Sequence, residues 1–225
     1  MSDWLAIVIS FIYIFASLGI AEGLRKVFRL SPEFTRKFVH IAVGMWSIGT
    51  ILLFQSRWMA IIPPASFVLL NYISYKKETF KAMESADKSN LGTIYFPLAF
   101  VFIVLIFWDT PNKLVAALMP LTWGDAMAAV LGKQYGHIKY TLFGHTRSVE
   151  GTVSMVLFSL ISVFPALWLL PPSMVPSMVP SMGIGTSLLI AVIVSFVTAA
   201  VEAASPWGID NLLVPAAAGL ILYFC

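Results

Sequence analysis

The chain has 225 residues, of which 59% are hydrophobic and only 11% are charged, and its mean hydropathy is +0.89. Because a soluble domain carries roughly 25% charged residues, this composition excludes a water-soluble globular protein and indicates an integral membrane protein. The single cysteine, Cys225, excludes an intrachain disulfide framework and a cysteine metal cluster. The net charge of +3 is too small to indicate a nucleic-acid partner.

Apolar runs follow one another along the whole chain. About 20 apolar residues cross a bilayer as a helix, and backbone groups inside lipid must pair within their own segment. The alternating ten-residue strands of a membrane barrel are absent. The sequence therefore predicts an all-α fold, a polytopic bundle of seven or eight transmembrane helices in a single domain of residues 1–225. The predicted spans are residues 4–21, 38–54, 58–73, 91–108, 113–131, 152–170, 184–201 and 209–225.

Basic residues predict the orientation of the bundle. Twelve of the fourteen lysines and arginines fall in the loops after the first, third and fifth spans, and only Arg57 and Lys113 fall on the other side. The positive-inside rule makes those loops cytoplasmic and places the N-terminus outside. Arg25 and Lys26 follow the first run where a cleaved signal peptide would have small residues, so we expect a retained helix. The uncharged stretch from Pro171 to Met182 is expected to be a stiff outer spacer.

The densest group of polar residues lies between Trp123 and Gly151. Asp125 falls inside an apolar span, where an ionised carboxylate is costly unless it meets a partner. Two explanations stay open: a hydrogen bond to a neighbouring helix, or a ligand for a divalent ion such as Mg²⁺, which carboxylates and substrate phosphates hold together.

Small and basic residues follow Asp125 closely. Gly132 and Gly136 allow a backbone to approach a phosphate, and the cations Lys133, Lys139 and Arg147 lie beside them. The soluble P-loop pattern does not occur in the chain. We therefore predict that residues 123–151 form a metal–nucleotide binding segment.

Three short motifs make this segment recognisable. It resembles the nucleotide-binding segment of the polyprenol kinase family, which comprises dolichol kinase, phytol kinase and CTP-dependent diacylglycerol kinase and is distantly similar to phosphatidate cytidylyltransferases. The motifs are Gly124-Asp125-x-x-Ala128, Gly132-x-x-x-Gly136 and Arg147-Ser148-x-Glu150-Gly151. Weaker similarities extend the resemblance to residues 33–215: Arg36-Lys37-x-x-His40, Asn90-Leu91-Gly92-Thr93, and Glu202 with Asp210-Asn211. Arg147 stands where the family often has lysine, which preserves the charge.

The resemblance implies an enzyme, a transferase that phosphorylates the hydroxyl of a membrane isoprenoid alcohol at the cytoplasmic interface. Phytol, geranylgeraniol or a polyprenol would be the acceptor, CTP the phosphoryl donor and Mg²⁺ the cofactor. Phosphoryl transfer mostly requires positioning and charge neutralisation. The resemblance leaves the oligomeric state open.

Residue roles follow from the resemblance and from position. We expect Asp125 to ligate the metal, and Glu150 to ligate a second metal or to cap its helix. Asp210 is a metal ligand, a general base or a helix cap. Glu202 ends an apolar span, where a carboxylate opposes the helix dipole, so we expect a cation beside it. The candidate nucleotide-binding residues are Gly132, Lys133, Gly136, Lys139, Arg147, Ser148, Arg36, Lys37, His40 and Asn90.

Simpler roles remain open for several of these residues. Lys139 also obeys the positive-inside bias, Arg36 and Lys37 also suit lipid headgroups, and Asn90 also suits a helix cap. Arg36 and His40, four residues apart, share one helical face.

Three other functions are alternatives to the kinase. A cytidylyltransferase would transfer CMP and release pyrophosphate where the kinase releases CDP, and a diacylglycerol kinase would use a different acceptor. A small transporter predicts polar groups spread along several helices and often an internal repeat. The ionisable residues instead gather on one side, which makes transport the weakest hypothesis.

Overall fold

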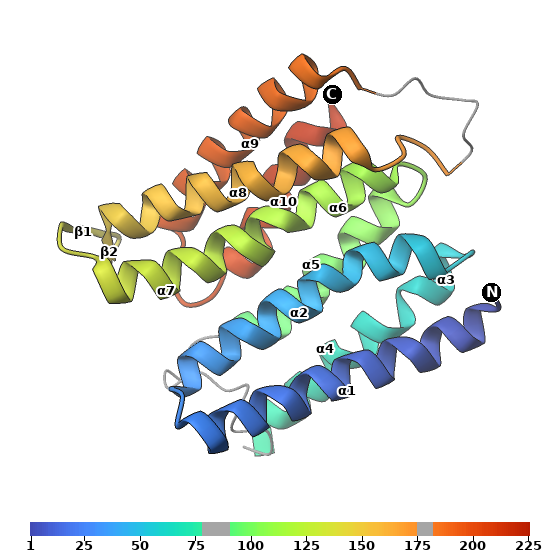
Figure 1. Ribbon diagram of the computed structural model, residues 1–225, viewed down its shortest axis with the longest axis horizontal. Helices are drawn as coiled ribbons and strands as arrows, with labels where there is room; N and C mark the ends of the chain where they lie inside the picture. The colour runs from blue at the N-terminus through green and yellow to red at the C-terminus, as the bar shows by residue number, and fades with distance from the viewer. Residues whose placement is uncertain (78–90, 175–181) are drawn as a thin grey trace.

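The predicted all-α bundle is confirmed. The computed structural model describes residues 1–77, 91–174 and 182–225, and its long helices run between two ends of the molecule (Figure 1). The helices are α1 (Asp3–Phe28), α2 (Pro32–Leu53), α3 (Arg57–Ala60), α4 (Ile62–Lys77), α5 (Gly92–Phe107), α6 (Pro111–Met119), the π-helical turn η1 (Pro120–Asp125), α7 (Ala126–Tyr135), α8 (Val149–Leu169), α9 (Ile184–Ala204) and α10 (Asp210–Tyr223).

Five of the described helical segments are long and apolar enough to cross a membrane. They are Asp3–Phe28, Arg57–Lys76, Pro111–Tyr135, Val149–Leu169 and Ile184–Ala204, and two shorter apolar helices are Gly92–Phe107 and Asp210–Tyr223. The connections from α1 to α2, from α7 to α8 and from α9 to α10 lie at one end of the bundle, and the N-terminus lies at the other (Figure 1). The number of crossings and the outside location of the N-terminus stay predictions. Most of the predicted spacer, residues 175–181, lies outside the described residues.

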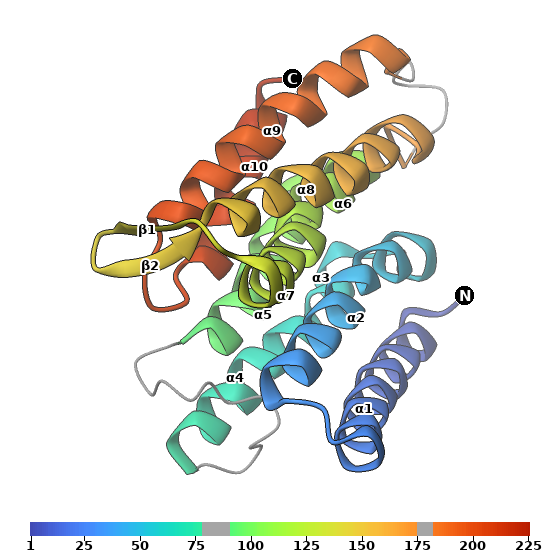
Figure 2. The same ribbon diagram turned by 60° about the vertical axis from the view of Figure 1, so that its left-hand side comes forward.

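The segment Pro111–Tyr135 forms the centre of the bundle. In its most apolar window 72% of the residues are buried, against 28% to 39% in the other four candidate spans. Its parts pack against α2, α5, α8, α9 and α10. Helices α1 and α4 lie at the edge (Figure 2), where α1 packs mainly on α2. Because lipid is as apolar as the core, such a bundle is held by close packing and internal polar contacts.

A π-helical turn interrupts this central segment. Pro120 has no N–H to donate to the preceding turn, which disrupts the α-helical hydrogen-bond ladder, and η1 runs from Pro120 to Asp125. Such wide turns often occur at functional sites. Here the turn ends at Asp125 and sets its direction, a feature that the sequence analysis did not predict.

The polar loop after α7 contains a small antiparallel hairpin. Strands β1 (Lys139–Leu142) and β2 (His145–Ser148) pair with Lys139 opposite Ser148. The turn residues Phe143 and Gly144 both have positive φ, at 47° and 81°, as two-residue hairpin turns require. The Oγ of Ser148 accepts the N–H of Gly151 at 3.1 Å and caps α8. Strand β2, which contains Arg147, therefore continues directly into α8 (Figure 1).

We predict that Gly44→Ala destabilises the bundle. A Cβ at Gly44 would lie 2.1 Å from the Oγ1 of Thr122, a buried residue of η1, so α2 and η1 would have to separate. Overpacking of this kind costs about 1–3 kcal/mol, which thermal unfolding in detergent should register as a lower melting temperature. Gly19→Ala in α1 is the matched control, because a Cβ there meets nothing within 4 Å. An unchanged melting temperature for Gly44→Ala would contradict the tight contact.

Candidate active site

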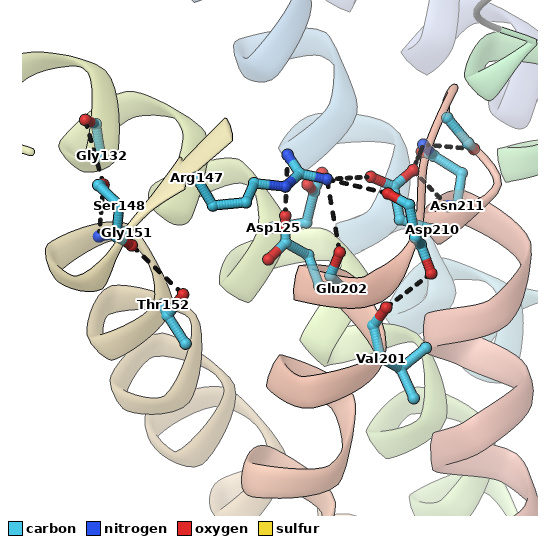
Figure 3. A network of polar contacts seen from close by, with 12 residues as sticks. Asp125, Gly132, Arg147, Ser148, Gly151, Thr152, Val201, Glu202, Asp210 and Asn211 are labelled. Atoms are coloured by element: carbon cyan, nitrogen blue, oxygen red, sulfur yellow. Dashed lines mark hydrogen bonds and ion pairs between the residues drawn. The ribbon is translucent and has the colours of Figure 1, made fainter. Parts of the chain in front are cut away.

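Three buried carboxylates meet at one point of the bundle. Asp125 ends η1, Glu202 lies in the last turn of α9, and Asp210 begins α10 (Figure 3). Each offers one oxygen, and these three oxygens lie within 4.8 Å of one another. The residues are only 5%, 4% and 7% exposed. We refer to these residues as the acid trio.

Two basic residues compensate the acid trio. The Nη1 of Arg147 lies 3.1 Å from Oε1 of Glu202, and its Nη2 lies 3.6 Å from Oδ2 of Asp210. The Nζ of Lys37 lies 2.6 Å from Oδ2 of Asp125. The prediction that a cation offsets Glu202 is confirmed. With every group ionised, the two cations leave one negative charge of the acid trio uncompensated.

The backbone holds Arg147 in this position. Its Nη2 donates to the carbonyl oxygen of Ser205 at 3.1 Å and to that of Glu202 at 3.4 Å, in the connection between α9 and α10. Its Nε is buried and has no hydrogen-bond partner among the described residues. A buried donor without a partner is costly, so this atom marks a place where a ligand acceptor would fit.

His40 also reaches the acid trio. Its Nε2 lies 2.8 Å from the carbonyl oxygen of Leu121, within η1, and 3.6 Å from Oδ2 of Asp125. A carbonyl oxygen only accepts, so Nε2 carries the proton in that contact. The ring also packs on Phe96 with centroids 4.6 Å apart. His40 therefore orients the π-helical turn beside Asp125.

A cavity of about 240 Å³ opens on one side of the acid trio. We call it the α1–α5 cavity, because α1, α2, α4 and α5 supply most of its wall. Its polar lining includes Asp125, Asp210, Arg147, Lys37 and Arg36, and its apolar lining includes Ile14, Leu18, Val43, Phe67, Phe96 and Pro97. This cavity thus joins two carboxylates to an apolar interior.

A second cavity, of about 300 Å³, lies under the hairpin. We call it the hairpin cavity. Three cations, Lys133, Lys139 and Arg147, line it together with Glu202, Gly132, Gly151, Ser148 and Thr146. Arg147 lines both cavities, Glu202 faces the hairpin cavity, and Asp125 and Asp210 face the α1–α5 cavity. The acid trio therefore lies between a basic cavity and a cavity whose lining is partly charged and partly apolar.

Other residues predicted for the site lie around the hairpin cavity. Lys133 forms an ion pair with Glu33, the Nζ of Lys139 lies 3.4 Å from the carbonyl oxygen of Gly132, and Ser148 caps α8. Arg36 lines the α1–α5 cavity. Asn90 lies outside the described residues.

Gly132 and Gly136 have a packing role. A Cβ at Gly136 would lie 2.7 Å from the Cβ of Ser148, which caps α8, and one at Gly132 would lie 3.1 Å from the Cα of Gly151. Both glycines therefore let α7 lie close to the start of α8. Gly132 also lines the hairpin cavity, so its predicted role beside a phosphate stays a prediction.

Glu150 lies at the base of the hairpin. Its Oε1 accepts the N–H groups of His137 and Ile138 at 2.9 and 3.1 Å. It therefore ties the start of the hairpin to the first turn of α8, while Asp125, Glu202 and Asp210 form the acid trio. Its predicted role as a second metal ligand stays a prediction.

Asn71 was not among the predicted site residues. It lies in α4, is 8% exposed and lines the α1–α5 cavity. Its Nδ2 donates to the carbonyl oxygen of Thr93 at 2.7 Å, whereas its Oδ1 has no partner among the described residues. The sequence distinguishes Asn71 only as a single amide side chain within an apolar run.

Comparison with known proteins adds named relatives. Over 222 residues the chain is 29% identical to a protein of Synechocystis sp. named phytol kinase, covering 98% of this chain and 91% of that protein. It is 25% identical over 167 residues to the Arabidopsis thaliana protein named farnesol kinase, chloroplastic, and 26% identical over 131 residues to a Glycine max protein named probable phytol kinase 2, chloroplastic.

The extent of these matches differs. The chain spans about half the length of the plant relatives, 54% of the Arabidopsis protein and 43% of the Glycine protein. No family model matches the chain, and no solved structure matches it.

We predict that the acid trio binds a divalent cation. Its carboxylate oxygens are the hard ligands that Mg²⁺ and Mn²⁺ prefer, and ligand binding to the folded state raises the melting temperature. Thermal unfolding should show a stabilisation by Mn²⁺ that is lost in Asp125→Asn and Asp210→Asn. Asp109→Asn, which changes an exposed acid paired with Arg57, should retain the stabilisation. An equal shift in all four proteins would place the ion elsewhere.

Proposed function

We propose that this chain, which is similar to proteins named phytol kinase and farnesol kinase, is a member of the polyprenol kinase family and transfers a phosphoryl group from a nucleoside triphosphate to the hydroxyl of an isoprenoid alcohol. We further propose CTP as the donor, Mg²⁺ as the cofactor, the cytoplasmic face of a membrane as the location, and residues 123–151 as the main nucleotide-binding segment of a single domain. Phytol and geranylgeraniol are the acceptors that we favour.

The observation that carries this proposal is the place of the acid trio between two unlike cavities. The hairpin cavity is lined by three cations and, among its described lining residues, by no apolar side chain larger than alanine, which suits a triphosphate. The α1–α5 cavity joins two carboxylates to apolar side chains, as a lipid alcohol requires. A water-soluble donor and a membrane-dissolved acceptor would therefore meet at the acid trio.

Lys37 and Arg147 already lie beside the acid trio, and we propose that they change partners when a nucleotide binds. Lys37 and Arg147 now neutralise carboxylates that would otherwise be costly to bury. A metal–triphosphate complex brings both signs of charge, so the acid trio would hold the metal while Lys37 and Arg147 turn to phosphate oxygens. The unpartnered Nε of Arg147 adds a donor for the same oxygens. Bound Mg²⁺ would neutralise charge that develops on the phosphate oxygens.

The residues then divide the reaction between them. We assign the general base to Asp210, because it faces the α1–α5 cavity and is held less closely by Arg147 than Glu202 is. The alcohol oxygen forms a bond to the γ-phosphorus, the bond from that phosphorus to the β-phosphate oxygen breaks, and CDP leaves. The hydroxyl proton passes to the carboxylate oxygen of Asp210 that does not hold the metal. Before the nucleotide binds, Glu202 keeps Arg147 in place. His40 keeps η1 and thus Asp125 in place.

We predict that carboxamide variants of the acid trio lose kinase activity without losing the fold. Purified protein in detergent with Mg²⁺, γ-labelled CTP and farnesol, phytol, geranylgeraniol, undecaprenol or diacylglycerol should label a prenyl alcohol and release CDP. Asp125→Asn and Asp210→Asn should each lower kcat by at least about a hundredfold, since each removes a group that acts on the reacting atoms. Both variants should still fold and show a cooperative melting transition without metal.

The control and the rival outcomes are direct. Asp109→Asn removes an acid that pairs with Arg57 and should leave activity unchanged. Label on diacylglycerol alone would show that the acceptor is diacylglycerol and not a prenyl alcohol. Release of pyrophosphate with a CMP-lipid product would show that the reaction is cytidylyl transfer and not phosphorylation. Near-normal turnover by Asp125→Asn would make that carboxylate structural.

A further inference from the structure

We propose that the isoprenoid tail occupies the apolar part of the α1–α5 cavity and that Phe67 sets the chain length the enzyme prefers. This inference rests on the proposed kinase function and adds a specificity-determining residue to it. Neither the sequence motifs nor the acid trio involve α4, to which Phe67 belongs.

The polarity of the cavity lining changes with depth. On α2 the lining passes from Glu33, Arg36 and Lys37, through Val39 and His40, to Val43. At a rise of 1.5 Å per residue, the stretch from Glu33 to Val43 is about 15 Å of helix. A molecule with its hydroxyl at the acid trio would therefore direct its other end toward apolar side chains.

The same gradient appears on the other helices. On α5 the lining passes from Gly92 and Thr93 to Phe96 and Pro97, and on α4 it passes from Asn71 to Phe67 one turn deeper. Ile14 of α1 is 4% exposed and lines the same region. A hydroxyl headgroup and an apolar tail match this lining, so we assign an isoprenoid alcohol as its occupant under the proposed function.

Phe67 forms the wall of the cavity toward the edge of the bundle. Its ring centroid lies 6.0 Å from that of Phe11 and 6.0 Å from that of Phe15, both on α1. Phe67 is 9% exposed, whereas Phe15 is 52% exposed. Helices α1 and α4 lie at the edge of the bundle (Figure 2). The Phe67 ring therefore separates the end of the cavity from the surrounding lipid.

A second apolar groove is the alternative binding site for the isoprenoid tail. It lies between α5 and α10, and none of its described lining residues is charged. A tail in that groove would have no carboxylate beside its hydroxyl. The α1–α5 cavity is favoured because the same lining holds Asp125 and Asp210.

Chain-length selectivity tests the role of Phe67. We expect Phe67→Ala to raise the ratio of kcat/KM for geranylgeraniol to that for farnesol by about tenfold, since pocket shape discriminates neighbouring homologues on this scale. Phe67→Trp should move the ratio in the opposite direction. Phe15→Ala is the matched control, because it removes a ring from the same aromatic cluster at a residue outside the cavity lining, and its ratio should equal that of the wild type. An unchanged ratio in active Phe67 variants would overturn the proposal.

A binding measurement separates this proposal from the kinase function. A farnesol analogue with a photoreactive group at the far end of its tail is cross-linked to wild-type protein, and the modified peptides are identified by mass spectrometry. Labelling at Phe67 or at Ile14–Leu18, suppressed by unlabelled farnesol, supports the proposal even if no alcohol is phosphorylated, in which case the kinase function fails alone. Labelling confined to the α5–α10 groove would overturn the proposal while kinase activity could still stand.

Discussion

The structure depends on the compensation of three carboxylates inside an apolar bundle. Asp125, Glu202 and Asp210 are nearly fully buried, and uncompensated charges are expensive in such surroundings. The compensating cations belong to separate elements. Arg147, in the hairpin, pairs with Glu202, and Lys37, near the start of α2, pairs with Asp125. Because removing one partner leaves a buried charge unpaired, these distant segments are energetically tied to one another. The close contact of α2 with η1 then fixes where the acids point.

Much of the architecture and part of the site could be predicted from the sequence. Each predicted span coincides with helix, because hydrophobicity over a membrane thickness is a local signal. The need of Glu202 for a cation was also predictable, since it follows from the helix dipole. The sequence did not predict which cation lies beside Glu202. Arg147 and Glu202 are far apart in the chain, and helical spacing linked His40 to Arg36, whereas the structure places His40 and Lys37 beside Asp125.

Glycine shows a different limit of sequence reasoning. The absence of a side chain signals that something approaches the backbone closely, but not what approaches. Gly136 faces Ser148 and the backbone of Gly132, so helix packing already accounts for it. The π-helical turn is similar, because Pro120 signals a disturbance of the helix without saying how the backbone responds. Both depend on neighbours that only the folded chain defines.

The arrangement of the bundle separates chemistry from selection of the lipid. The acids are carried by the central segment and by α9 and α10, which pack closely on one another. The wall at Phe67 belongs to α4 and packs against α1, at the edge of the bundle (Figure 2). A change in the size of that wall alters the apolar end of the cavity while the pairs that hold Asp125 and Glu202 remain in place. Under the proposed function, chain-length preference could therefore change by substitutions in α1 and α4 while the phosphoryl-transfer site is kept.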